Sequence, residues 1–133
     1  METKTNVKKQ SASLKETGEF FGKMYAFNNS LKLYHWHVSG KGSYAQHIAL
    51  DQALEALPDA LDRIVETSYA LHGDIKVVIP ETLIPVNIVD HCQKFFEYVD
   101  YQRDLFKENF TAAILDDYQE AIQQLLYRLK RLQ

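Results

Sequence analysis

Apolar side chains recur at spacings of three, four or seven residues along four long stretches of the chain. This is the pattern of amphipathic helices that bury one face. The first predicted helix starts at Ser13, a potential N-cap with an acidic residue three positions later, and ends at Gly40. The second starts at Ser43, continues to about Leu71 and contains Pro58, whose ring should bend the helix without ending it.

The second half of the chain predicts two more helices and the connection that leads to them. One helix covers roughly residues 87–108, and another is capped by Thr111 and ends in a basic last turn. The stretch before them, IKVVIPETLIPVN, is rich in Val and Ile but is interrupted by Pro80 and Pro85. A lone strand would have no partner, so we expect an extended crossover with at most one helical turn. The pattern therefore predicts an all-α fold, a ferritin-like four-helix bundle with a long crossover between helices 2 and 3.

Length and composition fit one globular domain. With 133 residues, 46% of them apolar, the chain can bury a core without disulfides. We expect a flexible N-terminal tail at residues 1–12 and a single domain at residues 13–133. The lone cysteine, Cys92, and a polar N-terminus favour a cytoplasmic protein, and no apolar run is long enough to span a membrane. The net charge of −3 argues against nucleic acid as a partner.

The candidate chemistry lies in one polar stripe of the second predicted helix. The stripe contains His47, Asp51, Glu55, Asp62 and Glu66, separated by 4, 4, 7 and 4 residues. At about 100° per residue, these spacings keep all five side chains on one face. Two acids one turn apart repel each other, and burial increases the cost unless a proton or a cation neutralises them. Carboxylate and imidazole ligands together suit iron, manganese or zinc.

His35, on the first predicted helix, is in phase with the apolar row and should face inward, where a neutral imidazole can bind a metal. Plainer interpretations stay open: the acids can form a solvated helix face, and His35 can be a hydrogen-bonded core histidine. His37, His72, His91 and Cys92 have no partner at a ligand spacing and are interpreted as structural or surface residues. The chain also lacks the Glu-x-x-His pairs of ordinary di-iron bundles.

The order of these residues resembles the ferroxidase motif of the Dps-like ferritins, also called miniferritins or DNA-protection during starvation proteins. The matching residues are His35-Trp36, Gly40, His47, Asp51, Asp62 and Glu66. The two histidines are 12 residues apart, and the following steps of 4, 11 and 4 residues agree with the motif without a gap. The segment TAAILDDYQEAIQQLLYRL also resembles the last helix of that family.

The resemblance implies a protein that binds iron and oxidises Fe(II) with hydrogen peroxide or dioxygen, for iron storage or protection against oxidative stress. In such a protein, His35 and His47 of one subunit and Asp62 and Glu66 of its mate form the ferroxidase site, and Asp51 assists as a further metal ligand. Trp36 resembles the aromatic residue beside that centre. The assembly is then a homo-oligomer, at least a two-fold dimer and, in the family, a dodecameric shell. Iron is the expected metal, with zinc or manganese as substitutes.

The sequence departs from that family in three places, one of which is Pro58 within the second predicted helix. The segment between the second and third predicted helices lacks the helix that those proteins use in their dimer contact, and the N-terminal tail is shorter and less basic than the arms that bind DNA. Two alternatives therefore remain. One is a non-catalytic ferritin-fold helical dimer that acts as a binding or interaction module. The other is oxidation of a small organic substrate at a di-metal centre.

Overall fold

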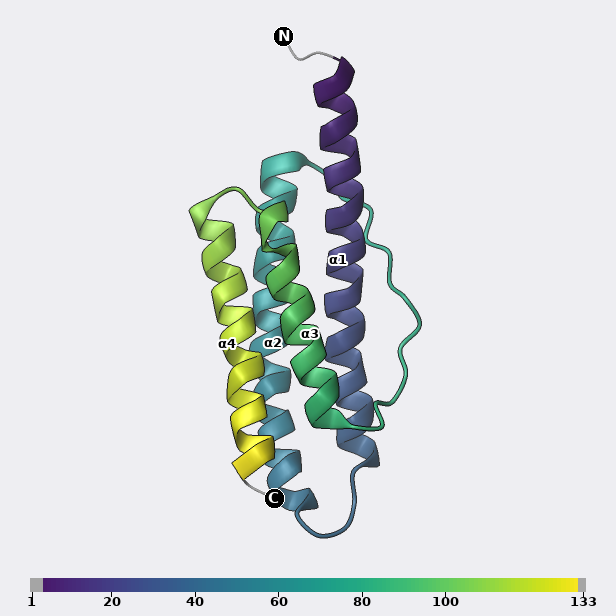
Figure 1. Ribbon diagram of the computed structural model, residues 1–133, viewed down its shortest axis with the longest axis vertical. Helices are drawn as coiled ribbons and strands as arrows, with labels where there is room; N and C mark the ends of the chain where they lie inside the picture. Colours follow the sequence, from purple (N-terminus) through teal and green to yellow (C-terminus); the bar gives the residue numbers. More distant parts are fainter. Residues whose placement is uncertain (1–3, 132–133) are drawn as a thin grey trace.

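The computed structural model describes residues 4–131, with side chains from residue 13 onward (Figure 1). This range forms α1 (Lys4–His37), α2 (Ser43–His72), α3 (Ile88–Gln102), the short 3-10 helix η1 (Arg103–Leu105) and α4 (Asn109–Arg131). The described range contains no strand, so the prediction of an all-α fold is confirmed. None of these helices is both long and apolar enough to cross a membrane.

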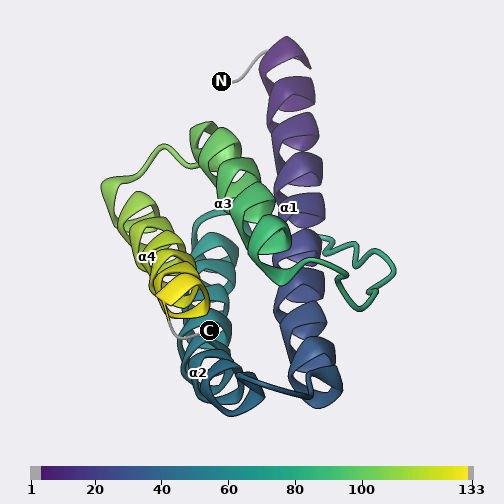
Figure 2. The same ribbon diagram turned by 60° about the horizontal axis from the view of Figure 1, so that its bottom comes forward.

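The four long helices form a bundle with one long connection. Figure 1 shows α1 and α4 running downward, whereas α2 and α3 run upward. Because α2 and α3 point the same way, the segment that joins them, residues 74–87, must travel back along the bundle. It does so on the outside of α1, as both Figure 1 and Figure 2 show. The predicted long crossover between the second and third helices is therefore present.

The core is built from seven-residue rows that face one another across the bundle. On α2, Leu50, Leu57 and Ile64 are all completely buried, and α2 packs mainly against α4 and α1. Each such side chain contributes about 1.5–3 kcal/mol through removal of its apolar surface from water. This buried row fixes the rotation of α2, so the opposite face, which carries the acids, points to solvent.

The crossover packs closely against α1 at two glycines that lie one helical turn apart. A Cβ at Gly18 would overlap the carbonyl oxygen of Lys76, and one at Gly22 would overlap that of Val78. The amide of Val78 also donates to the carbonyl of Gly18 at 3.2 Å. The crossover is thus extended, without a helical turn, and lies directly on the α1 backbone.

The predicted start of the first helix at Ser13 is wrong, because α1 already begins at Lys4. Residues 4–12 contain no glycine or proline that would stop a helix, so the segment that we predicted as part of a tail continues α1. Inside the helix, the carbonyl of Ser13 accepts a hydrogen bond of 2.8 Å from the Thr17 hydroxyl. Residues 1–3 of the predicted tail, and residues 132–133, lie outside the described part of the chain.

The second helix begins at Ser43 as predicted, but Ser43 is its first helical residue and the N-cap is Gly42, with φ of 82°. Pro58 lies inside α2, which continues through it. The predicted third helix is shorter than expected, because α3 ends at Gln102 and gives way to η1. Its N-cap is Asn87, whose side chain accepts a hydrogen bond of 3.0 Å from a backbone amide.

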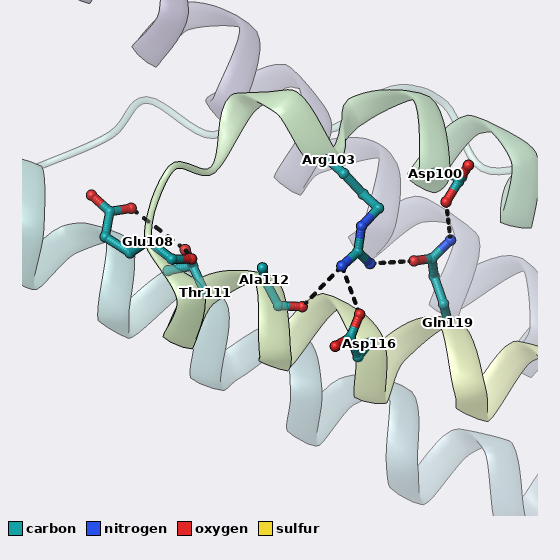
Figure 3. Close-up of polar contacts among 7 residues, drawn as sticks. All are labelled: Asp100, Arg103, Glu108, Thr111, Ala112, Asp116 and Gln119. Carbon is teal, nitrogen blue, oxygen red and sulfur yellow. Dashed lines mark hydrogen bonds and ion pairs between the residues drawn. The ribbon is translucent and has the colours of Figure 1, made fainter.

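The predicted cap of the last helix, Thr111, lies within the first turn of α4 and donates its hydroxyl to the Glu108 carbonyl at 2.9 Å. Nearby, Arg103 ties η1 to α4 (Figure 3). Its guanidinium donates to Gln119 at 2.5 Å and to Asp116 at 2.6 Å. The Gln119 amide donates in turn to Asp100 on α3 at 3.2 Å, so this network fixes the turn between the last two helices.

Candidate metal site

His35, His47 and Asp51 come together at the end of the bundle where α1 turns into α2. His35 lies in the last turn of α1, and the other two lie on the first turns of α2. The connection is tight because Gly40 and Gly42 adopt positive φ values of 88° and 82°, which L residues with side chains rarely adopt. This turn brings the two helices back against each other with the three side chains at the same level.

The His35 side chain lies close to both of the others. Asp51 Oδ1 lies 2.7 Å from His35 Nε2. The imidazole rings of His35 and His47 lie edge to face, with centroids 4.5 Å apart and planes at 84°. The resemblance to the Dps-like ferritins implies that His35 and His47 of one chain serve the same site, with Asp51 nearby, and the structure places the three side chains at the same end of the bundle.

Burial distinguishes His35 from Asp51. The His35 side chain is 16% exposed, whereas that of Asp51 is 55% exposed. Both ring nitrogens of His35 are buried and neither makes an aligned hydrogen bond, so the short contact to Asp51 is close without hydrogen-bond geometry. Buried ring nitrogens without partners are unusual and require an explanation. One explanation is a cation held by the imidazole nitrogen and the carboxylate oxygen, because both atoms are suitable metal ligands.

Asp62 and Glu66 do not join this cluster. Asp62 lies eleven residues beyond Asp51 on the same helix, which corresponds to about 16 Å along the helix axis. Both acids are exposed and line an apolar pocket between α1, α2 and the crossover. Among the residues that the structure describes, no group of three or more His, Cys, Asp or Glu side chains is arranged to hold a metal within one chain.

The spacing along α2 nevertheless has a definite symmetry. The midpoint between His47 and Glu66 and the midpoint between Asp51 and Asp62 are the same point, between Ala56 and Leu57. A two-fold axis across α2 at that point would place His47 opposite Glu66 of a second copy, and Asp51 opposite Asp62 of that copy. The four α2 residues of the predicted ligand set would then lie at matching levels across the axis.

The interior of the bundle is polar in one region, and the buried side chains within residues 13–131 include no carboxylate. Tyr118 is completely buried and donates its hydroxyl to Asn28 Oδ1 at 2.8 Å. Burial raises the pKa of the Tyr118 hydroxyl, and it raises the pKa of the buried Cys92 thiol to about 12. Neutral groups of this kind make a poor site for a di-metal centre inside the bundle.

The other histidines agree with their structural interpretation. His91 Nε2 lies 2.7 Å from the Ser30 hydroxyl, and its ring packs on Phe27 with centroids 5.1 Å apart. Burial lowers the pKa of His91, against a smaller opposite effect of Asp90. His37 and His72 are exposed.

Two of the polar contacts that sequence reasoning missed join side chains whose spacing has no recognisable signature. One is Ser30 with His91. The other is next to the candidate site, where the Tyr34 hydroxyl donates to Gln46 Oε1 at 3.3 Å. Burial, with a smaller effect of Cys92, raises the pKa of Tyr34. Tyr34 precedes His35, so this bond helps to hold the end of α1 against the start of α2.

Comparison with known proteins gives a family without an assigned activity. No curated protein and no solved structure matches the chain. One family model, described as a family of unknown function (DUF5856), matches residues 35–129. This range begins at His35 and includes the rest of the candidate cluster, α2, α3 and all but the last two residues of α4. The match spans well over half of the chain, and the chain belongs to the DUF5856 family.

Proposed function

We propose that this protein is a Dps-like ferritin that binds Fe(II) at a site shared between two copies of the chain. There it oxidises Fe(II) with hydrogen peroxide or dioxygen, for iron storage or peroxide detoxification. The observation that carries the proposal is the cluster of His35, His47 and Asp51, in which both ring nitrogens of the half-buried His35 are buried and lack aligned partners. It is supported by the common midpoint that relates this cluster to Asp62 and Glu66 on α2.

Each half-site lacks ligands that the other half supplies. The histidine cluster supplies nitrogen ligands and one carboxylate, and the distant pair supplies two carboxylates of like charge one helical turn apart. Bringing the carboxylates together under partial burial is costly unless a cation compensates. Fe(II) between the halves provides that compensation, and the mixed nitrogen and oxygen ligands suit it.

In the proposed reaction iron is the substrate. Imidazole nitrogens of His35 and His47 hold Fe(II) on one side, and the carboxylates of Asp62 and Glu66 hold it on the other, with Asp51 in support. Carboxylates favour Fe(III) over Fe(II), because their negative charge stabilises the more highly charged ion. A pair of ferrous ions gives up its electrons to one peroxide molecule, which takes up protons and leaves as water.

The assembly that this site requires is at least a two-fold dimer, and a dodecameric shell is the larger form that the resemblance implies. The protein would act in the cytoplasm, without a membrane or nucleic acid as a partner. Zinc or manganese would occupy the same ligands in place of iron.

A second candidate function is a non-catalytic ferritin-fold dimer that acts as an interaction module. The observation that favours it is the exposure of large apolar side chains along the crossover, among them Ile79 at 52% and Leu83 at 67%. Exposed apolar groups gathered on one segment indicate a contact surface. The two candidates differ in one result, since only the first requires Fe(II) to bind and to be oxidised.

The test is anaerobic addition of Fe(II), followed by peroxide, with the growth of ferric absorbance as the measurement. We expect saturable Fe(II) binding and oxidation faster than in protein-free buffer. His47→Ala and Asp62→Ala should each lose this activity. Their controls are His72→Ala and Asp59→Ala, which remove an exposed histidine and an exposed acid from the same helix. Activity in the first pair, or its loss in the controls, would contradict the proposed ligands.

A further inference from the structure

An apolar pocket of about 250 Å³ opens on the outer side of the bundle where the crossover lies against α1 and α2. Its walls are the apolar side chains of Phe21, Tyr25, Leu61, Val65, Val77 and Ile79, with Asp62 and Glu66 also lining it. The pocket exists because Gly22 lets the crossover approach the α1 backbone. Its apolar lining therefore lies directly beside the acidic half of the proposed site.

The pocket is partly open to solvent, although most of its lining is apolar. Ile79 is 52% exposed and Tyr25 is 47% exposed, and the neighbouring Val78 is 47% exposed. Apolar groups that gather around a cavity and remain in water indicate a surface that a partner covers. The acids at the same pocket favour a partner whose contacting segment is basic and aromatic.

The end of α1 has those properties. Trp36 is 69% exposed and is the only tryptophan in the chain. Lys32 lies on the same helix, with its ammonium 5.8 Å from the indole centroid, and His37 follows directly. A second copy of this chain can therefore present an exposed indole together with basic side chains.

The register of the helices brings this indole to the level of the pocket along α2. His35 contacts Asp51 and α1 runs antiparallel to α2, so Trp36 lies at the level of Leu50. The two-fold axis between Ala56 and Leu57 carries that level to Arg63, because helices rise uniformly at about 1.5 Å per residue. Arg63 lies within 61–66, the part of α2 that lines the pocket.

We propose that Trp36 of a second copy fills the pocket between α1, α2 and the crossover. Ile79 of the crossover is then an interface residue, and each copy gives one indole and receives one. This inference rests on the two-fold pairing of the proposed function. It assigns the extended crossover a role in self-association, and it requires no metal.

The experiment uses the fluorescence of Trp36, excited at the red edge of indole absorption so that tyrosines do not contribute. Emission is recorded over a dilution series of the metal-free protein, with sedimentation of the same samples. In the wild type, we expect the emission to shift to shorter wavelengths as the dimer forms. Ile79→Asp should weaken self-association by at least about tenfold, as loss of a central apolar contact does, and should keep the indole emission of an exposed side chain.

Val86→Asp is the matched control, because Val86 is also a β-branched crossover residue but is fully exposed and does not line the pocket. This variant should dimerise and shift its emission as the wild type does. A dimer in which Trp36 stays exposed, or an Ile79→Asp variant that associates normally, would overturn the inference. Iron oxidation by a dimer with an exposed Trp36 would leave the proposed function intact. A dimer with a buried Trp36 that does not oxidise iron would refute only the function.

Discussion

Subunit mixing provides a quantitative test of a shared site. His47→Ala destroys the histidine half that its own chain contributes to one site, and Asp62→Ala destroys the acidic half that its own chain contributes to the other site. The two residues lie about 22 Å apart along α2, so neither substitution should alter the other half directly. Both are on the surface or half-buried, and replacing them should leave the core intact.

The expected recovery follows from symmetry alone. When equal amounts of the two inactive variants exchange at random, half of the dimers contain one chain of each kind. In such a dimer one site takes its histidines from the Asp62→Ala chain and its acids from the His47→Ala chain, and is intact, whereas the other site lacks both. The mixture should therefore recover about a quarter of the wild-type activity.

The assay is the initial rate of ferric absorbance after the mixture has been held until exchange is complete, with exchange followed by mass-labelled subunits. A mixture of His47→Ala with His35→Ala is the control, because both changes fall in the same half and no intact site can form. Zero recovery in the first mixture, despite proven exchange, would mean that the ligands do not come from two chains. Recovery in the control mixture would exclude the assigned halves.

Three further predictions concern the fold that holds the site. Gly22→Ala should lower the free energy of unfolding by about 1–2 kcal/mol in chemical denaturation, because the clash with the Val78 carbonyl exceeds the gain of up to about 1 kcal/mol in helix propensity. Arg103→Ala should cost about 1–2 kcal/mol in the same assay through the loss of charged hydrogen bonds, one of them to the exposed Asp116. Cys92, which is buried and has its pKa raised to about 12, should resist alkylation in the native protein and react only after unfolding; ready alkylation of the native protein would contradict this.

The helices were predictable because their apolar rows are long and regular, but their ends were not. Ser13 with an acidic residue three positions later has the composition of a capping box, and the same residues fit equally well inside a helix. Only the absence of a helix-stopping residue before Ser13 indicated that the helix extends further. The prediction that Thr111 caps the last helix was wrong for a related reason, since its hydroxyl donates to a backbone carbonyl rather than accepting from a backbone amide.

The candidate site was predictable to the extent that it depends on local geometry. The glycine-containing turn after His35 and the helical step from His47 to Asp51 could be read from the sequence, whereas the joint placement of His35 and His47 was implied only by the resemblance to the Dps-like ferritins. The position of the crossover against α1 could not be inferred from spacing. It depends on backbone carbonyls that contact Gly18 and Gly22 from a segment more than fifty residues away, and no periodicity records that contact.

The positions of the acids imply that metal binding and self-association are thermodynamically linked. In a single chain Asp51, Asp62 and Glu66 are exposed and carry little electrostatic cost. In the proposed dimer they approach one another and lose water, so that without a cation they oppose association. A metal that binds both halves must therefore tighten the dimer by the same factor as the dimer tightens metal binding.

This linkage gives Asp62→Ala two opposite effects that can be measured in one experiment. Sedimentation with and without Zn(II), which occupies similar ligands and has no redox chemistry, reports the association constant directly. In the wild type, Zn(II) should strengthen association by at least about tenfold, the usual range of coupling between sites. Asp62→Ala should associate more strongly than the wild type when metal is absent, because a repulsive charge is gone, yet respond much less to Zn(II). If Zn(II) leaves the wild-type association constant unchanged, the ligands cannot be divided between two chains.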